Sequence, residues 1–334
     1  MRPPDRILIC RTDNIGDVVL TLPLAGYLKT RFPQARIDLL CRAYVAPAMR
    51  HSRFLDRVIT LEEAGEPLDF FGKERYDTVI FAFPDRRLAK AAKRARVPQR
   101  VGTSHRLYHW LTCNRLAHFS RVKSNLHEAQ LNFLLLKPLG IEHVPQLDEM
   151  PALYGLEAPR RPAVDALLQA GKRHFILHPK SNGSGREWPL AHFTALAREL
   201  AIDADIRLFV TGSAAEGSLI AQQAPDLLAL PNVENLCGKL DLDGLLALIG
   251  TCDGLVASST GPLHLSAAVG TRTLGLFPPI KPLDPGRWGP LGTRAEVLCA
   301  DQPCAGCNDT ATCTCMGSIT PQHVAARLRA WARN

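Results

Sequence analysis

The sequence lacks the patterns that identify several common classes of protein. No apolar run approaches the roughly 20 residues that a membrane-spanning helix needs, and residues 1–5 precede the first predicted strand without the apolar segment of a signal peptide. There is no H-E-x-x-H, no G-x-S-x-G and, after the first predicted strand, no G-x-G-x-x-G. These absences favour a cytoplasmic protein and give little support to a hydrolase or to an enzyme that uses NAD.

Acidic residues are missing from one long stretch of the chain. Between residues 86 and 123, eleven Lys and Arg occur without an acidic residue. Residues 1–150 hold 24 basic and 16 acidic residues, whereas residues 151–334 hold 16 of each, so the net charge of +8 comes from the first part. Two interpretations are open: a solvated helix face, or a surface for an anionic partner. Among such partners nucleic acid is the weakest candidate, because the stretch has few aromatics for base stacking and no nucleic-acid-binding motif.

The chain alternates strand and helix patterns, and its 334 residues suit two domains. In the first half, apolar runs predict strands at 6–10, 37–41, 57–60 and 78–83, with helical patterns near 17–31, 43–50, 86–96 and 127–139. In the second half we expect strands at 174–178, 206–210, 254–257 and 273–277, and helices at 189–200, 216–223, 242–251, 263–269 and 322–332. This rhythm is typical of parallel sheets with helices on both faces.

Four prolines accumulate around residues 145–162, where the periodicity breaks down. We therefore expect an interdomain linker there, with one domain at 1–155 and a second at 156–334. The simplest α/β assembly is two Rossmann-like domains whose parallel sheets face a central cleft. The last helix belongs to the second domain by sequence, and packing of this helix on the first domain is an open alternative.

The turn after the first predicted strand carries the most informative carboxylate. Asp17 lies where the strand gives way to a helix, and Gly16 permits a tight turn between them. Ligands of open α/β folds bind at this edge of the sheet. Asp17 is therefore a candidate functional residue or, in the plainer interpretation, only a helix cap.

Two turns of the second half are suited to phosphate. In the first, residues 258–264, Ser-Ser-Thr-Gly-Pro-Leu-His, follow a strand and open a helix, so their amides and hydroxyls would meet an anion at the helix N-terminus. In the second, Lys180 and Arg186 flank a flexible loop that also joins a strand to a helix, although the loop is not a Walker motif. Each turn also has a plain structural interpretation, as a Ser/Thr cap and as a loop beside a core Trp. A third strand ends at Thr211, and Glu216 shortly after it could accept ribose hydroxyls.

Five cysteines cluster near the C-terminus. In a reducing compartment such a cluster favours a metal over disulfides. The spacing C-x-x-C followed by C-x-C lacks the two paired C-x-x-C motifs of a confident zinc site, so unliganded thiols are the preferred interpretation and a structural Zn or Fe is the alternative. The four candidate ligands are Cys304, Cys307, Cys313 and Cys315.

Taken together, the motifs resemble those of glycosyltransferase family 9, the ADP-heptose:lipopolysaccharide heptosyltransferases. The resemblance extends over the whole chain and rests on residues 11–23, 186–189, 238–245 and 259–264. It implies the GT-B fold, with an N-terminal acceptor domain and a C-terminal nucleotide-sugar domain. It also implies an inverting transfer of heptose from ADP-heptose to the anionic inner core of lipopolysaccharide. No metal or other cofactor would be required in the active site, and the enzyme would be cytoplasmic and peripheral on the inner membrane.

The resemblance also implies roles for individual residues. Asp17 matches the general base. The residues that match donor-binding positions, or lie beside them, are Lys180, Ser181, Arg186, Thr211, Glu216, Leu240, Ser259, Thr260, Gly261 and His264. For the anionic acceptor we expect contacts from Asn14 and from the basic residues Arg86, Arg87, Lys90 and Lys93.

Two departures from the family pattern bear on specificity. Arg186 stands where better-known members have Lys, and Ser259 stands where an Asp often touches the donor sugar. The second departure puts the identity of the donor sugar in doubt. The alternative function is a transferase of the same family that uses another nucleotide sugar or a protein acceptor. In some protein-modifying relatives, cysteines like those near this C-terminus hold iron.

Overall fold

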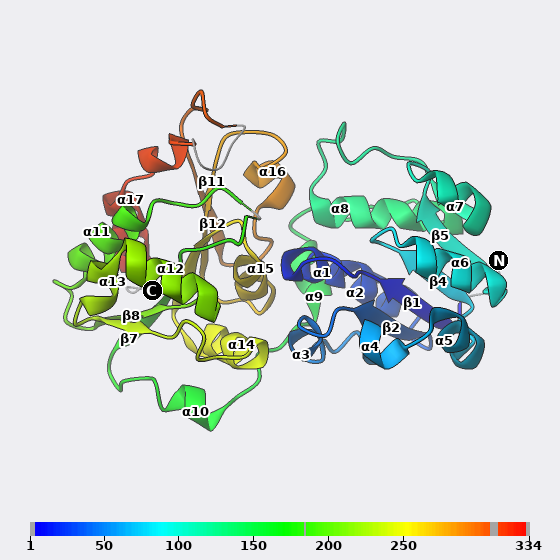
Figure 1. The fold of residues 1–334 in the computed structure, drawn as a ribbon, viewed down its shortest axis with the longest axis horizontal. Coiled ribbons are helices and arrows are strands. Elements are labelled where there is room, and N and C mark those ends of the chain that lie inside the picture. Colours follow the sequence, from blue (N-terminus) through cyan, green and yellow to red (C-terminus); the bar gives the residue numbers. More distant parts are fainter. Residues whose placement is uncertain (1–3, 184, 308–312, 332–334) are drawn as a thin grey trace. The chain divides into compact units, whose positions relative to one another are not determined.

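The structure is a computed structural model that describes residues 4–183, 185–307 and 313–331. It divides the chain into two compact units, Met1–Glu157 and Ala158–Asn334, and each unit is built on one six-stranded sheet (Figure 1). No helix in these described ranges is both long and apolar enough to cross a membrane.

The first unit has a fully parallel sheet with the order β3-β2-β1-β4-β5-β6. Its strands are β1 (Arg6–Cys10), β2 (Arg36–Cys41), β3 (Arg57–Thr60), β4 (Thr78–Phe81), β5 (Gln99–Thr103) and β6 (Arg115–Ala117). Its helices are α1 (Ile15–Val19), α2 (Leu22–Arg31), α3 (Ala46–Met49), α4 (Leu61–Ala64), α5 (Pro67–Glu74), α6 (Arg86–Arg94), α7 (Leu107–Thr112), α8 (Glu128–Phe133), the 3₁₀ helix η1 (Leu134–Leu139) and α9 (Met150–Tyr154).

The second unit repeats this plan, with the order β12-β11-β10-β7-β8-β9. Its strands are β7 (Arg173–His178), β8 (Ile206–Val210), β9 (Val233–Asn235), β10 (Gly254–Ser258), β11 (Thr273–Phe277) and β12 (Ala295–Cys299). Its helices are α10 (Pro162–Asp165), α11 (Leu190–Leu200), α12 (Ala214–Gln223), α13 (Pro225–Ala229), α14 (Leu242–Thr251), α15 (Gly261–Ala268), α16 (Pro285–Trp288), the 3₁₀ helix η2 (Cys315–Ser318) and α17 (Pro321–Trp331).

Both sheets follow the doubly wound Rossmann order. Counted from the first strand of each unit, the order is 3-2-1-4-5-6 in both. The central strands β4, β10 and β11 are buried along their whole length, which requires cover on both faces. The prediction of parallel, doubly covered α/β sheets is therefore confirmed.

Four strands were missed by the sequence analysis. They are short or rich in charged and polar residues: β5, β6, β9 and β12. Three of them, β6, β9 and β12, form sheet edges. An edge strand has a neighbouring strand on one side only, so it is less buried than a central strand. A strand without a continuous apolar run gives no clear periodic signal.

The helix predicted at 17–31 is two helices. It breaks between α1 and α2, and Pro23 lies in the first turn of α2. Proline in the interior of a helix removes a donor and clashes with the carbonyl four residues before it, so the break places Pro23 where proline is tolerated. Thr21 Oγ1 donates to the carbonyl of Asp17 across the break, at 2.8 Å.

The predicted linker at 145–162 is wrong in its middle part. Residues 150–154 form α9, in which Met150 and Tyr154 are buried, and α9 packs on α2. Gly26 of α2 lies directly against the backbone of Leu153, where any side chain would collide. The prolines therefore mark short turns and helix starts rather than an extended linker.

The last helix belongs to the second unit. α17 packs on α11, and Val324, Leu328 and Trp331 contribute to the core around Trp188 and Phe193. The expectation that this helix could return to the first unit is replaced by that packing. Residue 332, the predicted end of the helix, lies outside the described residues.

Candidate active site

The strand order reverses once in each unit, between β1 and β4 and between β7 and β10. Ligands of doubly wound folds bind beyond the carboxyl ends of the strands at such a switch point. The turn that contains Asp17 follows β1. The loop from Lys180 follows β7, and the turn that contains Thr260 follows β10. The topology thus places the main predicted motifs at the two switch points.

Arg11 organises the switch point of the first unit. It directly follows β1 and is 3% exposed. Its Nε donates to Asp13 Oδ1 at 2.8 Å, and its Nη2 donates to Asp17 Oδ1 at 2.5 Å. Its Nη1 reaches the carbonyl of Ala82, just after β4, at 3.3 Å. One buried guanidinium therefore joins both strands of the switch point to two carboxylates.

A second layer of polar residues lies behind Arg11. Its Nη1 is 3.2 Å from Asn132 Oδ1 and 3.5 Å from Glu128 Oε1, both on α8. Arg121 also pairs with Glu128. Glu128 is 2% exposed and Asn132 0%. This layer was not predicted, although Glu128 and Asn132 are polar residues one helical turn apart on a helix whose residues are all buried.

Asp17 is not the cap of its helix. Asn14, which is exposed, occupies the N-cap position of α1, and Asp17 lies in the first turn with its carboxylate on Arg11. Asp13 is a second carboxylate at the same site. Burial raises the pKa of Asp13, and the charge of Asp17 adds to this effect while Arg11 opposes it. A half-buried carboxylate with a shifted pKa is itself a candidate functional group.

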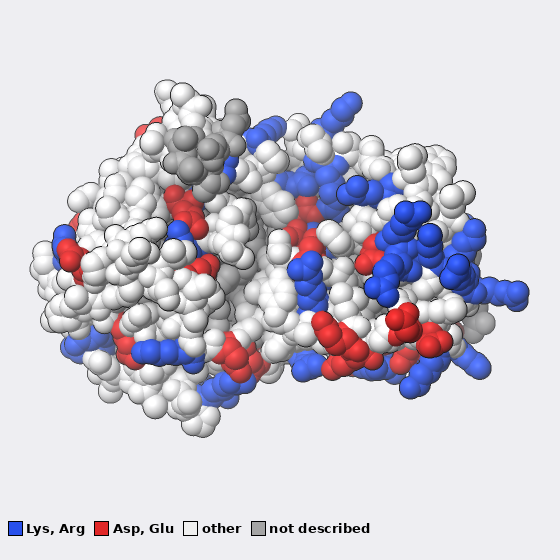
Figure 2. All heavy atoms as spheres, viewed as in Figure 1, with Lys and Arg blue, Asp and Glu red and all other residues white. Residues whose placement is uncertain are grey.

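The basic stretch does not form one continuous surface. Arg86, Arg87, Lys90 and Lys93 are exposed on α6, and Figure 2 shows Lys and Arg gathered over this part of the first unit. Arg100, in contrast, turns inward and donates to the carbonyls of Val97 and Thr112, and burial lowers its pKa. Arg121 is likewise engaged with Glu128. Only part of the stretch is available to an anionic partner.

The turn before α15 holds a hydroxyl whose hydrogen bonding is incomplete. Thr260 is the N-cap residue and is 5% exposed, yet its side chain does not make the usual cap hydrogen bond. Its Oγ1 is buried and has no partner among the described residues. Gly261 opens the helix, and His264 follows one turn later, 2% exposed. The arrangement leaves a buried hydroxyl beside helix amides, which suits an anionic oxygen.

The loop after β7 packs on this turn. A Cβ on Gly185 would lie 2.8 Å from the carbonyl oxygen of Ser259, and the amide of Trp188 donates to Ser258 Oγ at 3.2 Å. Within the loop, Lys180 is paired with the carboxylate of Glu187, which also accepts from the Ser181 amide at 2.8 Å. The predicted cation Lys180 thus has an internal partner.

Arg186 is held by a segment far away in sequence. Its Nη2 donates to the carbonyl of Cys307 at 2.7 Å. The loop is fixed further by Trp188, whose Nε1 donates to the carbonyl of Ile319 at 2.9 Å. Residues near the C-terminus therefore position the loop beside the Thr260 turn.

The other predicted donor residues lie on neighbouring elements. Thr211, immediately after β8, is 2% exposed and its Oγ1 is 2.9 Å from His178 Nδ1. Glu216 accepts from the Ser213 amide at 2.7 Å and so completes a capping box on α12. Leu240 is half-buried beside Gly244. A structural role for Glu216 is therefore visible, whereas its part in ribose binding stays a prediction.

The four predicted cysteine ligands are brought together. Their Sγ atoms all lie within 4.8 Å of one another, and the shortest separation is 3.3 Å, between Cys313 and Cys315. A tetrahedron of Zn–S bonds of about 2.3 Å has sulfurs about 3.8 Å apart. The donor set and spacing fit a tetrahedral thiolate site. A hydrogen bond from the amide of Thr314 lowers the pKa of Cys304 to about 6, which favours the thiolate that a metal requires, whereas burial raises the pKa of Cys307 and of Cys315.

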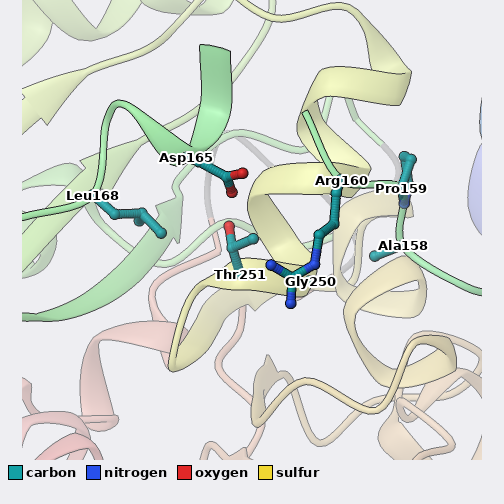
Figure 3. A pocket seen from close by; sticks show the side chains of 7 residues that line it. All are labelled: Ala158, Pro159, Arg160, Asp165, Leu168, Gly250 and Thr251. Carbon is teal, nitrogen blue, oxygen red and sulfur yellow. The ribbon is translucent and has the colours of Figure 1, made fainter. Parts of the chain in front are cut away.

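A cavity of about 510 Å³ lies elsewhere in the second unit, beside α10 and α14 (Figure 3). The described residues that line it include none of the predicted site residues. They are Ala158, Pro159, Arg160, Asp165, Leu168, Gly250 and Thr251.

The fold and the turns define a class of protein. It is an α/β protein of two Rossmann-like units, and the second unit has turns suited to phosphate binding at its switch point. Comparison with known proteins identifies the family. The sequence model of glycosyltransferase family 9 (heptosyltransferase) matches residues 72–315. The chain belongs to this family and is a glycosyltransferase.

Individual relatives agree with this assignment. The chain is 25% identical over 319 residues to lipopolysaccharide heptosyltransferase 2 of Escherichia coli, covering 88% of this chain and 87% of the relative. The solved E. coli ADP-heptose lps heptosyltransferase II superposes with a TM-score of 0.73 at 21% identity over 98% of both chains. An E. coli heptosyltransferase solved with ADP-2-deoxy-2-fluoro heptose gives 0.67 at 20% identity, over 97% of this chain and 99% of the other. The α/β fold is thus that of GT-B heptosyltransferases.

His178, at the carboxyl end of β7, generates a prediction on stability. Burial lowers the pKa of His178 from 6.5 to about 4, so the native state favours the neutral ring. This contribution is complete above pH 6.5 and is lost as the pH falls toward 4. Between pH 7 and pH 5 the free energy of unfolding should fall by about 2 kcal/mol more in the wild type than in His178→Gln.

Urea denaturation at both pH values measures the difference. His323→Gln is the matched control, because His323 is exposed on α17, and it should behave like the wild type. An equal pH dependence in His178→Gln and the wild type would show that His178 protonates as easily in the native protein as in the unfolded one.

Proposed function

We propose that this glycosyltransferase moves heptose from ADP-heptose to an anionic acceptor of the lipopolysaccharide inner core, with inversion at the anomeric carbon. The observation that carries the proposal is the buried Thr260 hydroxyl at the N-terminus of α15, which lacks a partner among the described residues. A buried hydroxyl without a hydrogen bond costs about 1–3 kcal/mol. A diphosphate oxygen at the switch point would remove this cost.

In this proposal the second unit binds the donor. Thr260, Gly261 and the helix N-terminus hold the diphosphate, and Arg186, which Cys307 fixes, adds a positive charge. His264 supports the turn from within α15. Lys180, Ser181 and Ser259 border the same turn, while Thr211, Glu216 and Leu240 lie toward the nucleoside. The name of the E. coli relative, an ADP-heptose heptosyltransferase, supports this choice of donor.

The first unit binds the acceptor and supplies the base. Asp17 takes the proton of the acceptor hydroxyl as the oxygen attacks the anomeric carbon, and the ADP diphosphate leaves. Arg11 holds the carboxylate of Asp17 in one orientation. Base assistance of this kind contributes about 10²–10⁴-fold, and the donors around the diphosphate stabilise the charge that develops on it. No step needs a metal.

Asn14 and the exposed cations of α6 are the acceptor-binding residues of the proposal. Arg86, Arg87, Lys90 and Lys93 face solvent and can contact acceptor phosphates. The names of the relatives, lipopolysaccharide heptosyltransferases, support an acceptor of this class. Because such an acceptor is anchored in lipid, we place the enzyme at the cytoplasmic face of the inner membrane.

A second candidate keeps the reaction but changes the substrate. The second candidate is a family member that uses another nucleotide sugar or a protein acceptor. Ser259, which lies in the Thr260 turn in place of the Asp that often touches the donor sugar, favours the first of these two changes. A thermal-shift screen of nucleotide sugars separates the two candidates. Stabilisation by ADP-heptose alone supports the first, and stabilisation by a different nucleotide sugar supports the second.

Replacement of the base should separate catalysis from donor binding. We expect Asp17→Asn to lower kcat by about 10²–10⁴-fold and to leave the Kd for ADP unchanged, because the amide keeps the shape of the side chain but cannot accept the proton. Asp13→Asn is the matched control, since Asp13 contacts the same guanidinium. A large loss in Asp13→Asn combined with near-normal turnover in Asp17→Asn would transfer the role of base to Asp13.

Thr260→Val should have opposite effects on the free and the ADP-bound protein. Removal of a buried hydroxyl that lacks a partner raises the Tm without ligand, whereas loss of its bond to the diphosphate weakens ADP binding by about 5–30-fold. Thr194→Val is the control, because the hydroxyl of Thr194 is already bonded to the carbonyl of Leu190 at 3.1 Å. That variant should be less stable and bind ADP normally. Calorimetry and thermal unfolding measure both quantities, and unchanged ADP affinity in Thr260→Val would move the diphosphate elsewhere.

We also propose that the four cysteines hold a structural Zn or Fe. When bound, this ion would cross-link the segment whose Cys307 carbonyl fixes Arg186, and it would take no part in the transfer. Its contribution is therefore to stability and, through Arg186, to the shape of the donor loop.

Cys313→Ser should lose the metal, whereas Cys299→Ser should keep it. Cys299 is exposed and lies outside the group of four sulfurs, so it controls for a general effect of cysteine replacement. Elemental analysis of the purified protein should find about one ion per chain in the wild type and in Cys299→Ser. The Tm should fall and the Kd for ADP should rise in Cys313→Ser alone. A wild-type protein purified without any metal would leave the cysteines as thiols.

A further inference from the structure

Helix α7 presents its apolar side to solvent. Leu107, Trp110 and Leu111 are 86%, 57% and 74% exposed, and their spacing of three and four residues places them on one face of the helix. Helices of folded domains normally turn such a face to the core. We call Leu107, Trp110 and Leu111 the α7 patch.

The opposite side of α7 is polar and buried, which fixes the orientation of the helix. His109 is 0% exposed and its Nδ1 is 2.9 Å from the carbonyl oxygen of Thr103. Thr112 is 5% exposed and donates to the carbonyl of Tyr108 at 2.7 Å. Trp110 is also held, because its Nε1 donates to the carbonyl of Ser104 at 2.9 Å. The α7 patch cannot turn inward without breaking these bonds.

Positive charge borders the α7 patch. α7 packs against α6, and Lys93 Nζ of α6 donates to the carbonyl of Leu111 at 2.7 Å. Arg106, immediately before α7, is exposed, as are the cations of α6, which Figure 2 shows on this unit. No acidic residue occurs between residues 86 and 123. Exposed apolar groups bordered by cations match the chemistry of an anionic lipid surface.

We propose that the α7 patch inserts into the interface of an anionic phospholipid bilayer, while the surrounding Lys and Arg contact its headgroups. Trp favours this boundary because its ring is apolar and its N–H is polar. The inference rests on the proposed function and deepens it, since it names the surface that brings the enzyme to a lipid-anchored acceptor.

Charge argues against a second copy of the chain as the occupant. In a two-fold symmetric contact each surface meets itself, so the cations around one α7 patch would face those around the other. Like charges brought together in this way repel. A bilayer that contains anionic lipid offers the opposite charge to the same cations.

Vesicle binding tests the proposal directly. We expect the wild type to sediment with phosphatidylcholine vesicles that contain phosphatidylglycerol, and to do so less at high salt or with phosphatidylcholine alone. The double variant Leu107→Gln with Leu111→Gln should bind at least about tenfold more weakly, because two apolar side chains no longer leave water. Ile202→Gln is the matched control, since Ile202 is 82% exposed in the second unit, and it should bind like the wild type.

The depth of insertion is read from Trp110. Brominated lipid should quench the fluorescence of the wild type on binding, and Trp110→Phe should lose most of this quenching while it still sediments. Equal quenching in the wild type and Trp110→Phe would show that another tryptophan meets the lipid and would overturn the proposal.

Two acceptors separate this inference from the proposed function. The Leu107/Leu111 variant should transfer normally to a lipid-free core oligosaccharide and poorly to the same core embedded in vesicles. If the wild type binds vesicles but transfers to neither acceptor, the proposed function fails and the membrane surface stands. If the double variant binds vesicles like the wild type, the α7 patch is not the membrane surface. If the wild type is a dimer that the variant dissociates, the occupant is a second copy, and this inference is overturned.

Discussion

The site of the first unit depends on a single buried guanidinium. Arg11 follows β1 and donates to the carbonyl of Ala82 after β4. It also donates to the carboxylates of Asp13 and Asp17 and to Asn132 of α8. A buried cation is costly unless its donors are satisfied, and here the three guanidinium nitrogens all have partners. The orientation of the Asp17 carboxylate is therefore fixed by the same guanidinium that links the ends of β1 and β4. The orientation of the Asp17 carboxylate and the polar contacts between Arg11 and α8 therefore cannot be changed independently.

The two units share a strand order but have different kinds of residue at their switch points. The first fills its edge with charged side chains around Arg11, and the second offers a hydroxyl and helix amides at Thr260. The difference follows from the proposed chemistry, because a proton acceptor must be a side chain whereas a diphosphate is well held by main-chain donors. A common fold thus supplies position, and the residues after β1 and β10 supply function.

The sequence predicted what depends on local pattern. Buried strands such as β1 and β10 have continuous apolar runs, and Asp17 and Thr260 follow them at the sheet edge, so both the fold class and the placement of these motifs could be inferred. The contacts of Arg11 could not, because Glu128 and Asn132 lie 117 and 121 residues away in sequence. The pairing of Lys180 with Glu187 was hidden for a different reason, since a loop has no periodicity to show which charges meet.

Long-range contacts also give the C-terminal segment its meaning. The carbonyls of Cys307 and Ile319 accept hydrogen bonds from Arg186 and Trp188, and Trp188 in turn binds Ser258, just before the Thr260 turn. The cysteine segment, the loop after β7 and the turn after β10 therefore form one connected structure. In the proposed function, a metal held by these cysteines would support donor binding indirectly, because the Cys307 carbonyl accepts the hydrogen bond that positions Arg186. In this proposal the cysteines take no part in the transfer, yet their arrangement affects the donor loop through this chain of hydrogen bonds.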